Sequence, residues 1–215
     1  MYADISVQLV SLIYIVILSG VYFLKRKYNF LESKVYKFLL ISTIGSLLLD
    51  IVSMYILSSQ VYSVDINNLF SKIYFISLFI WIIAFIFYVI LNNTTVKFND
   101  FKTLIKKSTL CKGWVVLSVI LFILLIILKI DYSVSPVGYY GDGVILIYAL
   151  GIIGSLFLLF MLLFNSKKSS NDKNWSVLIS IMILCIAFFI QMNTNGIFIL
   201  GSVTALITMF LYLII

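Results

Sequence analysis

The sequence predicts an all-α integral membrane protein, a bundle of seven transmembrane helices that takes up residues 1–215 as a single domain. Hydrophobic residues make up 63% of the chain and charged residues only 11%, whereas about a quarter of a typical soluble domain is charged. Seven apolar runs have about the length that a helix needs to cross a bilayer, roughly 17–25 residues. Basic residues gather in alternate connectors between these runs, which is typical of a multi-pass topology.

The seven predicted helices follow one another with short connectors. They cover residues 5–24, 37–59, 69–91, 114–130, 144–164, 175–192 and 197–215. No internal repeat and no low-complexity linker interrupts the series, so the sequence predicts one domain.

The first apolar run has no basic residue before it, and the cluster Lys25-Arg26-Lys27 follows it. This order favours a retained first helix with its N-terminus outside over a cleavable signal peptide. The first, third and fifth connectors hold all other basic residues except Lys72 and Lys129. The C-terminus is therefore expected in the cytoplasm, and the net charge of +7 reflects membrane topology rather than nucleic acid binding.

The second run carries Asp50 well inside its apolar stretch. Ser42, Ser46, Asp50 and Ser53 follow one another at intervals of four, four and three residues, so they share one helical face. An ionisable group at that depth is costly unless it faces the protein interior, which makes Asp50 a candidate functional residue. The alternative is a structural hydrogen-bond hub held by hydroxyls and amides of neighbouring helices, and the serine face supports both.

The third run carries Tyr74, Ser77, Trp81, Ala84 and Tyr88 on one stripe, which is expected to face inward because the O–H and N–H groups need partners. The stripe is either an aromatic core or the wall of a ligand pocket. Lys72, about one turn inside the same helix, either pairs with Asp50 or extends to the outer surface.

The remaining runs carry smaller signals. Gly151, Gly154 and Ser155, and likewise Gly201, Ala205 and Thr208, let helices approach closely. Gln191 lies close to the outer end of the sixth run, as a buried hydrogen-bonding group or a polar group at a pocket mouth. Loop 131–143, rich in glycine and containing Pro136, is expected to turn tightly and cover the bundle mouth. The basic connector 101–110 is either an interfacial helix or a solvated loop.

Several functional classes lack the residues that they require. The chain has no histidine, and Cys111 and Cys185 lie in different environments, so neither is expected to bind metal, form a disulfide or act as a nucleophile. The sequence predicts no catalytic site, no metal and no cofactor. The seventh run has no lysine for a retinal Schiff base, and the chain has no Asp-Arg-Tyr or Asn-Pro motif of a G-protein-coupled receptor.

The segments LESKVYKFLLISTIGSLLLDIVSMYIL and LFSKIYFISLFIWIIAFIFYVIL resemble the N-terminal seven-helix region of bacterial membrane histidine kinases and GGDEF diguanylate cyclases. The likeness includes the start of the second helix, Asp50 and the aromatic third helix. The residues that carry it are Glu32, Lys34, Tyr36, Lys37, Asp50, Trp81 and Tyr88. The resemblance implies a sensor or anchor module of the bacterial plasma membrane, which either continues into a cytoplasmic kinase or cyclase domain, the favoured expectation, or works without one.

The expected function is therefore to relay a small-molecule, lipid or membrane-partner signal to a cytoplasmic output domain. The expected partners are membrane lipids, a small or lipidic ligand and a second copy of the chain in a homodimer. The alternatives are a small ion-coupled transporter or channel that uses Asp50, and a structural subunit of a membrane complex. The candidate ligand-binding residues are Asp50, Ser46, Ser53, Tyr74, Ser77, Trp81 and Gln191, with Lys72 as a candidate ion-pair partner.

Overall fold

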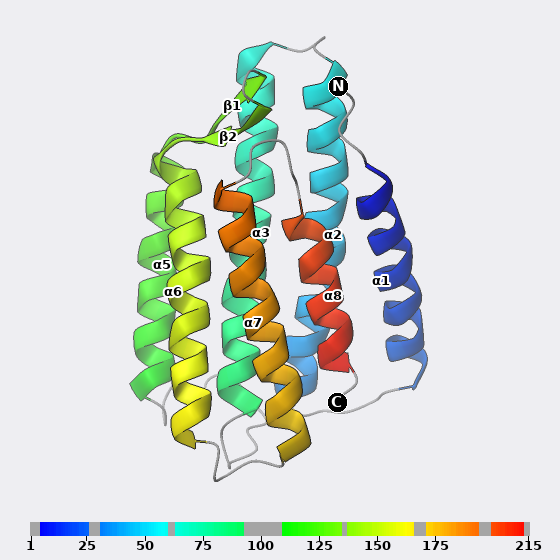
Figure 1. Cartoon of the computed structure of the whole chain (residues 1–215), viewed down its shortest axis with the longest axis vertical. Helices are drawn as coiled ribbons and strands as arrows, with labels where there is room; N and C mark the ends of the chain where they lie inside the picture. The colour runs from blue at the N-terminus through cyan, green and yellow to red at the C-terminus, as the bar shows by residue number, and fades with distance from the viewer. Residues whose placement is uncertain are drawn as a thin grey trace.

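The structure, a computed structural model, describes residues 5–25, 31–59, 63–92, 109–134, 137–165, 171–193 and 199–212. These residues form seven α-helices and one two-stranded antiparallel hairpin (Figure 1). The elements are α1 Ser6–Lys25, α2 Leu31–Ser59, α3 Val64–Asn92, α5 Thr109–Ile127, β1 Asp131–Val134, β2 Val137–Tyr140, α6 Asp142–Asn165, α7 Asn171–Asn193 and α8 Leu200–Tyr212.

The predicted helical character is confirmed, and five of these helices are long and apolar enough to cross a membrane: α1, α2, α3, α6 and α7. The chain is thus an all-helical protein, apart from the short hairpin, that fits a multi-pass membrane bundle. The apolar parts of α5 and α8, Cys111–Ile127 and Leu200–Tyr212, are shorter. Seven membrane crossings and the orientation of the termini remain predictions.

Helices α2 and α3 extend beyond the apolar runs that predicted them, to 29 residues each. Their added residues include polar side chains, and each helix has an acidic residue in its first turn, Glu32 in α2 and Asp65 in α3. A carboxylate there interacts favourably with the unpaired N–H groups and the positive end of the helix dipole. Connector 101–110 lies outside the described residues, except that Thr109 and Leu110 open α5.

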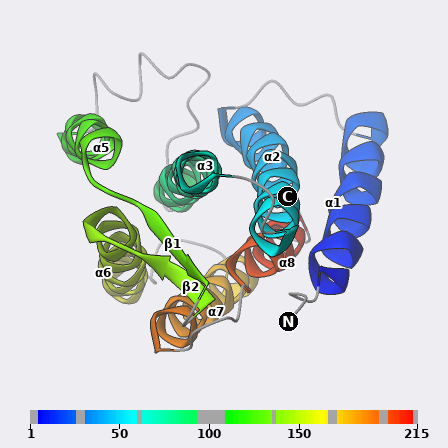
Figure 2. The same ribbon diagram turned by 90° about the horizontal axis from the view of Figure 1, so that it is seen from above.

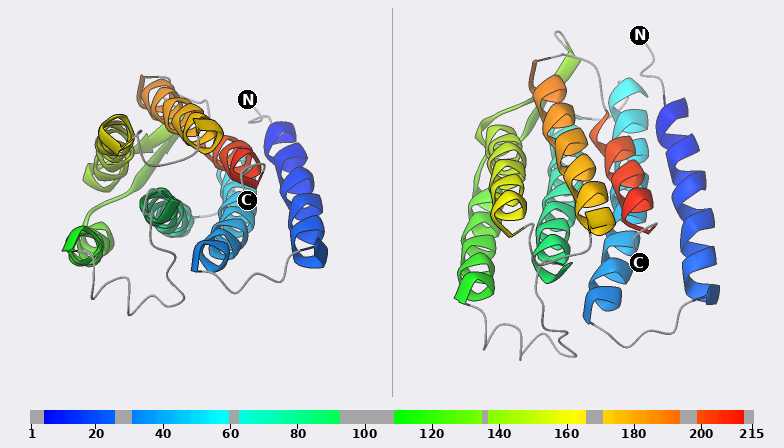
Figure 3. Two further views of the ribbon diagram at one scale, coloured as in Figure 1. Left: turned by 90° about the horizontal axis from the view of Figure 1, so that it is seen from below. Right: turned by 60° about the horizontal axis from the view of Figure 1, so that its bottom comes forward.

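Helix α3 lies between α5 and α6 on one side and α2 on the other (Figure 2). It packs most extensively against α2, and it also contacts α5 and α6. On the other side of α2, α8 fits between α1, α2 and α7. Helix α1 stands at one edge and packs against α2 and α8 (Figures 1 and 3).

The inward stripe predicted for α3 is confirmed. Trp81 and Tyr88 are fully buried, Tyr74 and Ala84 nearly so, and Ser77 is half-buried. Trp81 stacks on Phe85 with ring centroids 5.3 Å apart. The stripe therefore forms the aromatic core of the bundle.

Gly151 shows that the predicted close helix packing occurs between α6 and α7. A Cβ atom at this position would lie 2.3 Å from the ring of Phe188 on α7. That distance is far below van der Waals contact, so only glycine permits the present approach of the two helices.

The loop before α6 forms the hairpin β1–β2, in which Asp131 pairs with Tyr140 and Val134 with Val137. A tight turn over the bundle was predicted, but strand pairing was not. Tyr139 of β2 contacts Tyr74 and Phe75 of α3, with ring centroids 6.0 and 4.9 Å away. The hairpin therefore lies on the same end of the bundle as the start of α3 (Figure 1).

Candidate functional site

Asp50 lies at the junction of three helices. Its side chain, on α2, is fully buried. A Cβ atom on Gly201 of α8 would lie only 2.4 Å from Asp50 Oδ2, so the carboxyl packs directly on the backbone of α8. The side chain of Gln8 on α1, which is 1% exposed, interacts with the same carboxyl.

The Asp50 carboxyl has unused hydrogen-bonding capacity. Within the described residues, neither of its oxygens has a hydrogen-bond partner of normal geometry, and the side chain of Gln8 is the polar group that interacts with it. A buried polar group without a partner costs about 1–3 kcal/mol, and more if it is charged. A hydrogen-bond donor or a cation that reached this carboxyl would therefore gain free energy.

The serine face of α2 is buried next to Asp50 but does not hold its carboxyl. Ser46 and Ser53 are fully buried. The hydroxyl of Ser46 donates to the Thr43 carbonyl at 3.0 Å, and that of Ser53 to the Phe70 carbonyl at 3.4 Å. These two serines therefore do not hold the Asp50 carboxyl, and a structural role for Asp50 through groups of neighbouring helices, such as the Gln8 amide, stays open as the alternative prediction.

A second polar cluster ties α2, α3 and α8 together. The Trp81 indole Nε1 donates to the Thr43 hydroxyl at 2.9 Å and lies 3.3 Å from the Thr208 hydroxyl. The two threonine hydroxyls are 2.9 Å apart, and Tyr36 donates to the Thr208 carbonyl at 3.0 Å. We call Tyr36, Thr43, Trp81 and Thr208 the threonine–tryptophan cluster.

This cluster lies about 10 Å along the helices from Asp50, since Thr43 precedes Asp50, and Thr208 follows Gly201, by seven residues at about 1.5 Å each. Helix α8 therefore contacts α2 at two polar points, Gly201 on Asp50 and Thr208 on Thr43. Of the predicted site residues, Trp81 belongs to this cluster and not to the surroundings of Asp50.

Tyr74 lies within electrostatic range of the Asp50 carboxyl and belongs to an aromatic group beneath the hairpin. Its ring stacks on Tyr139, and the group continues through Phe75 to Tyr148, 6.1 Å away. The hydroxyl of Ser77 donates to the Tyr74 carbonyl at 2.7 Å. Ser77 is thus satisfied within its own helix.

Gln191 has the structural role that was one of its two interpretations. Its Oε1 accepts a hydrogen bond of 3.0 Å from the Ile199 amide. Ile199 directly precedes α8, so Gln191 positions the start of that helix and, with it, Gly201 beside Asp50.

The hypothesised ion pair between Lys72 and Asp50 is wrong. The Lys72 ammonium group donates instead to the Ile126 carbonyl in the last turn of α5. A helix C-terminus has unpaired carbonyls and a partial negative charge, which favours a cation there. The side chain of Lys72 thus extends away from Asp50, as the alternative prediction had it.

Sequence reasoning missed Gln8, Thr43 and the direct contact of Gly201. Gln8 is the only amide in the apolar run 5–24, and this signal was available. Thr43 directly follows Ser42, but it is not one of the residues that the intervals of four, four and three place on the serine face. The contact of Gly201 joins residues 151 positions apart and had no local signal.

A groove of about 540 Å³ runs between α1 and α8 beside this junction. Val7 and Ser11 of α1 and Ser202 of α8, sequence neighbours of Gln8 and Gly201, line it. The Ser202 hydroxyl has no hydrogen-bond partner within the described residues. A mostly apolar groove with a few polar atoms is typical of a small-molecule site.

Among the described residues, no group of three histidine, cysteine or acidic side chains is placed to hold a metal ion. Comparison with known proteins finds no matching family model, no matching curated protein and no matching solved structure. The likeness to bacterial membrane sensors therefore stays a prediction.

Proposed function

We propose that the chain is a membrane sensory module that binds an amphipathic ligand at the junction of α1, α2 and α8. Its place would be the bacterial plasma membrane, with a cytoplasmic output domain as its target. The observation that carries the proposal is the buried Asp50 carboxyl, whose oxygens have no hydrogen bond of normal geometry within the described residues and which packs on Gly201. Both of its oxygens accept hydrogen bonds, so a suitable ligand brings a donor or a cationic head group.

The adjoining groove supports the same proposal, because its apolar walls suit a hydrocarbon tail. Helix α1 packs only at the edge of the bundle, so a ligand that separates α1 from α8 disturbs few other contacts. A ligand that prefers one packing of α8 over another shifts the population of the two. Since α8 contacts α2 at Gly201 and at Thr208, a change beside Asp50 reaches the other end of α8.

The binding test uses dodecylamine, which has a donor head group, and dodecanoic acid, which has the same chain and an acidic head. We expect dodecylamine to raise the melting temperature of the purified protein, because a ligand that binds the folded state stabilises it. The increase is expected to vanish in Asp50→Leu and to persist in Ser42→Ala, whose hydroxyl donates only to the Leu39 carbonyl. Equal effects of both amphiphiles, or no loss in Asp50→Leu, would reject the site.

The response test places spin labels at Ile17 of α1 and Phe210 of α8, both outside the lining of the groove. Dodecylamine is expected to shift the distance between the labels in wild type and to leave it unchanged in Asp50→Leu. The transporter alternative predicts something else: flux in proteoliposomes that is lost in Asp50→Asn. If such flux is measured and the distance between the labels does not change, the sensory proposal is rejected in favour of the transporter.

A further inference from the structure

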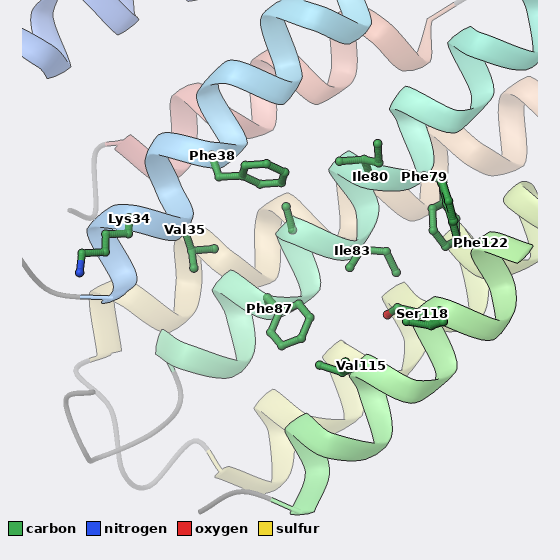
Figure 4. Close-up of a pocket in the computed structure, with 12 residues that line it drawn as sticks. Lys34, Val35, Phe38, Phe79, Ile80, Ile83, Phe87, Val115, Ser118 and Phe122 are labelled. Atoms are coloured by element: carbon green, nitrogen blue, oxygen red, sulfur yellow. The ribbon is translucent and has the colours of Figure 1, made fainter. Parts of the chain in front are cut away.

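A second groove lies on the opposite side of the bundle, between α2, α3 and α5 (Figure 4). Its volume is about 520 Å³, within the usual range of ligand sites, roughly 300–1,000 Å³. Helices α2 and α5 each pack against α3 rather than against each other, which leaves the groove open to the outside over α3. The residues that matter for its occupant are Lys34, Phe38, Phe79, Ile83, Val115 and Ser118.

The groove is apolar along its length and basic at one end. Phenylalanine, isoleucine and valine side chains form its walls (Figure 4). Its one uncharged polar side chain, Ser118, already donates its hydroxyl to the Trp114 carbonyl at 2.7 Å. Lys34, in the first turns of α2, is the only charged residue of the lining.

A second lysine lies near the same end. Lys112 is in the first turn of α5, three residues before Val115, so the two share a helical face. The starts of α2 and α5 both lie at the lower end of the bundle in Figure 1. The charge of the groove lining therefore lies at this end, where a ligand meets Lys34 and Lys112.

The length of the groove matches one leaflet of a bilayer. Along α5 it extends from Val115 to Phe122, and along α3 from Phe79 to Phe87, about 10–12 Å at 1.5 Å per residue. Half of a hydrocarbon core of about 30 Å is about 15 Å. A transmembrane helix of a partner would need a groove along the full width of the membrane.

We propose that this groove binds one anionic phospholipid, with an acyl chain over α3 and the phosphate beside Lys34. Binding of the acyl chain contributes affinity, because the chain and the apolar walls of the groove gain close van der Waals contacts. The lysines contribute head-group selectivity, since a basic residue near an anionic lipid surface is worth roughly a fivefold preference. The proposal concerns a different face from the Asp50 junction and does not depend on it.

The test measures lipid retained by the full chain in native mass spectrometry. The protein is delipidated in detergent and given equal amounts of dioleoyl phosphatidylglycerol and dioleoyl phosphatidylcholine. We expect one retained lipid per chain, with phosphatidylglycerol preferred about fivefold or more.

Two pairs of variants separate the head group from the chain. Lys34→Glu is expected to abolish the preference, while Lys37→Glu keeps it, because the Lys37 ammonium lies over the Phe23 ring of α1, 5.3 Å from its centroid. Ser118→Trp fills the groove and is expected to abolish retention of both lipids. Leu117→Trp is its control, because Leu117 is exposed and does not line the groove.

Three results would overturn the proposal. They are equal retention of the two lipids by wild type, the same loss in Lys37→Glu as in Lys34→Glu, and unchanged retention in Ser118→Trp. A change from dimer to monomer in Ser118→Trp would assign the groove to a second copy of the chain instead. Monodisperse elution of each variant verifies that it is folded.

Discussion

Asp50 places a carboxyl in a fully buried position where the described residues offer its oxygens no hydrogen bond. Most buried polar groups in native proteins are hydrogen-bonded, so an exception points to a role beyond packing. The neighbouring serines use their hydroxyls on backbone carbonyls, which leaves the carboxyl to interact with Gln8 or a ligand.

Replacement of Asp50 by leucine is expected to raise the stability of the ligand-free protein. Leucine has a similar size and no polar atom, so the substitution removes a desolvation cost of about 1–3 kcal/mol. Asp50→Asn keeps the shape of the side chain and leaves a polar amide buried, so its effect on stability should be smaller. Thermal unfolding in detergent measures both, and a clear loss of stability in Asp50→Leu would mean that the carboxyl is held by partners after all.

Gly201→Ala is expected to destabilise the protein by about 1–3 kcal/mol, because the new Cβ atom would lie 2.4 Å from Asp50 Oδ2 and overpack the junction. The double variant Asp50→Ala, Gly201→Ala should recover part of this loss, since the two positions are in contact. Gly45→Ala on α2 is the control. A Cβ atom there meets nothing within 4 Å, so helix propensity should make it neutral or stabilising.

At the scale of elements, α8 is held by polar contacts at Gly201 and Thr208 and by the hydrogen bond between Ile199 and Gln191. Thr208 joins it to Thr43 and Trp81, and Gln191 fixes its start through Ile199. Since α8 has only 13 residues, these contacts are a large part of what positions it.

Thr43→Val is expected to loosen the contact between α2, α3 and α8. The substitution keeps the shape but removes the acceptor of the Trp81 N–H, which costs about 1–3 kcal/mol when the donor is left buried. Thermal unfolding provides the measurement. Ser77→Ala is the matched control with little effect, because that hydroxyl bonds within its own helix; equal losses would argue against the threonine–tryptophan cluster.

The hairpin depends on Gly141, whose φ is +110°. A Cβ atom there would also lie 2.6 Å from the Lys129 carbonyl oxygen. Gly141→Ala is therefore expected to cost about 1–3 kcal/mol in backbone strain and to speed amide hydrogen exchange in β1 and β2. Gly113→Ala, with open space at its Cβ, should leave exchange in the hairpin unchanged.

At the scale of the whole molecule, the predicted orientation is open to a direct measurement. In a background without Cys111 and Cys185, single cysteines at Tyr140 and at Lys34 lie at opposite ends of the bundle. If the positive-inside rule holds, a membrane-impermeant maleimide labels the first on intact cells and the second only after lysis. The reverse pattern would invert the topology and move the lipid groove to the outer leaflet.

Hydropathy predicted the helices that make the junction, but not its geometry. The inward stripe of α3 and the buried serine face of α2 follow from helical spacing, and both were predicted correctly. The prediction that Lys72 pairs with Asp50 was wrong because the Lys72 ammonium group donates to the Ile126 carbonyl at the end of α5. Strand pairing in loop 131–143 was missed because glycine and proline indicated a turn more strongly than strands.

Hydropathy and helical spacing by themselves determined that the protein is a helical membrane bundle and that Asp50 lies inside it. Those properties depend on residues close together in the chain. Only the tertiary structure decided what Asp50 meets, because Gln8 and Gly201 come from helices at opposite ends of the sequence. Their meeting depends on the order in which helices pack around α3, and that order arises from the fit of all their side chains together.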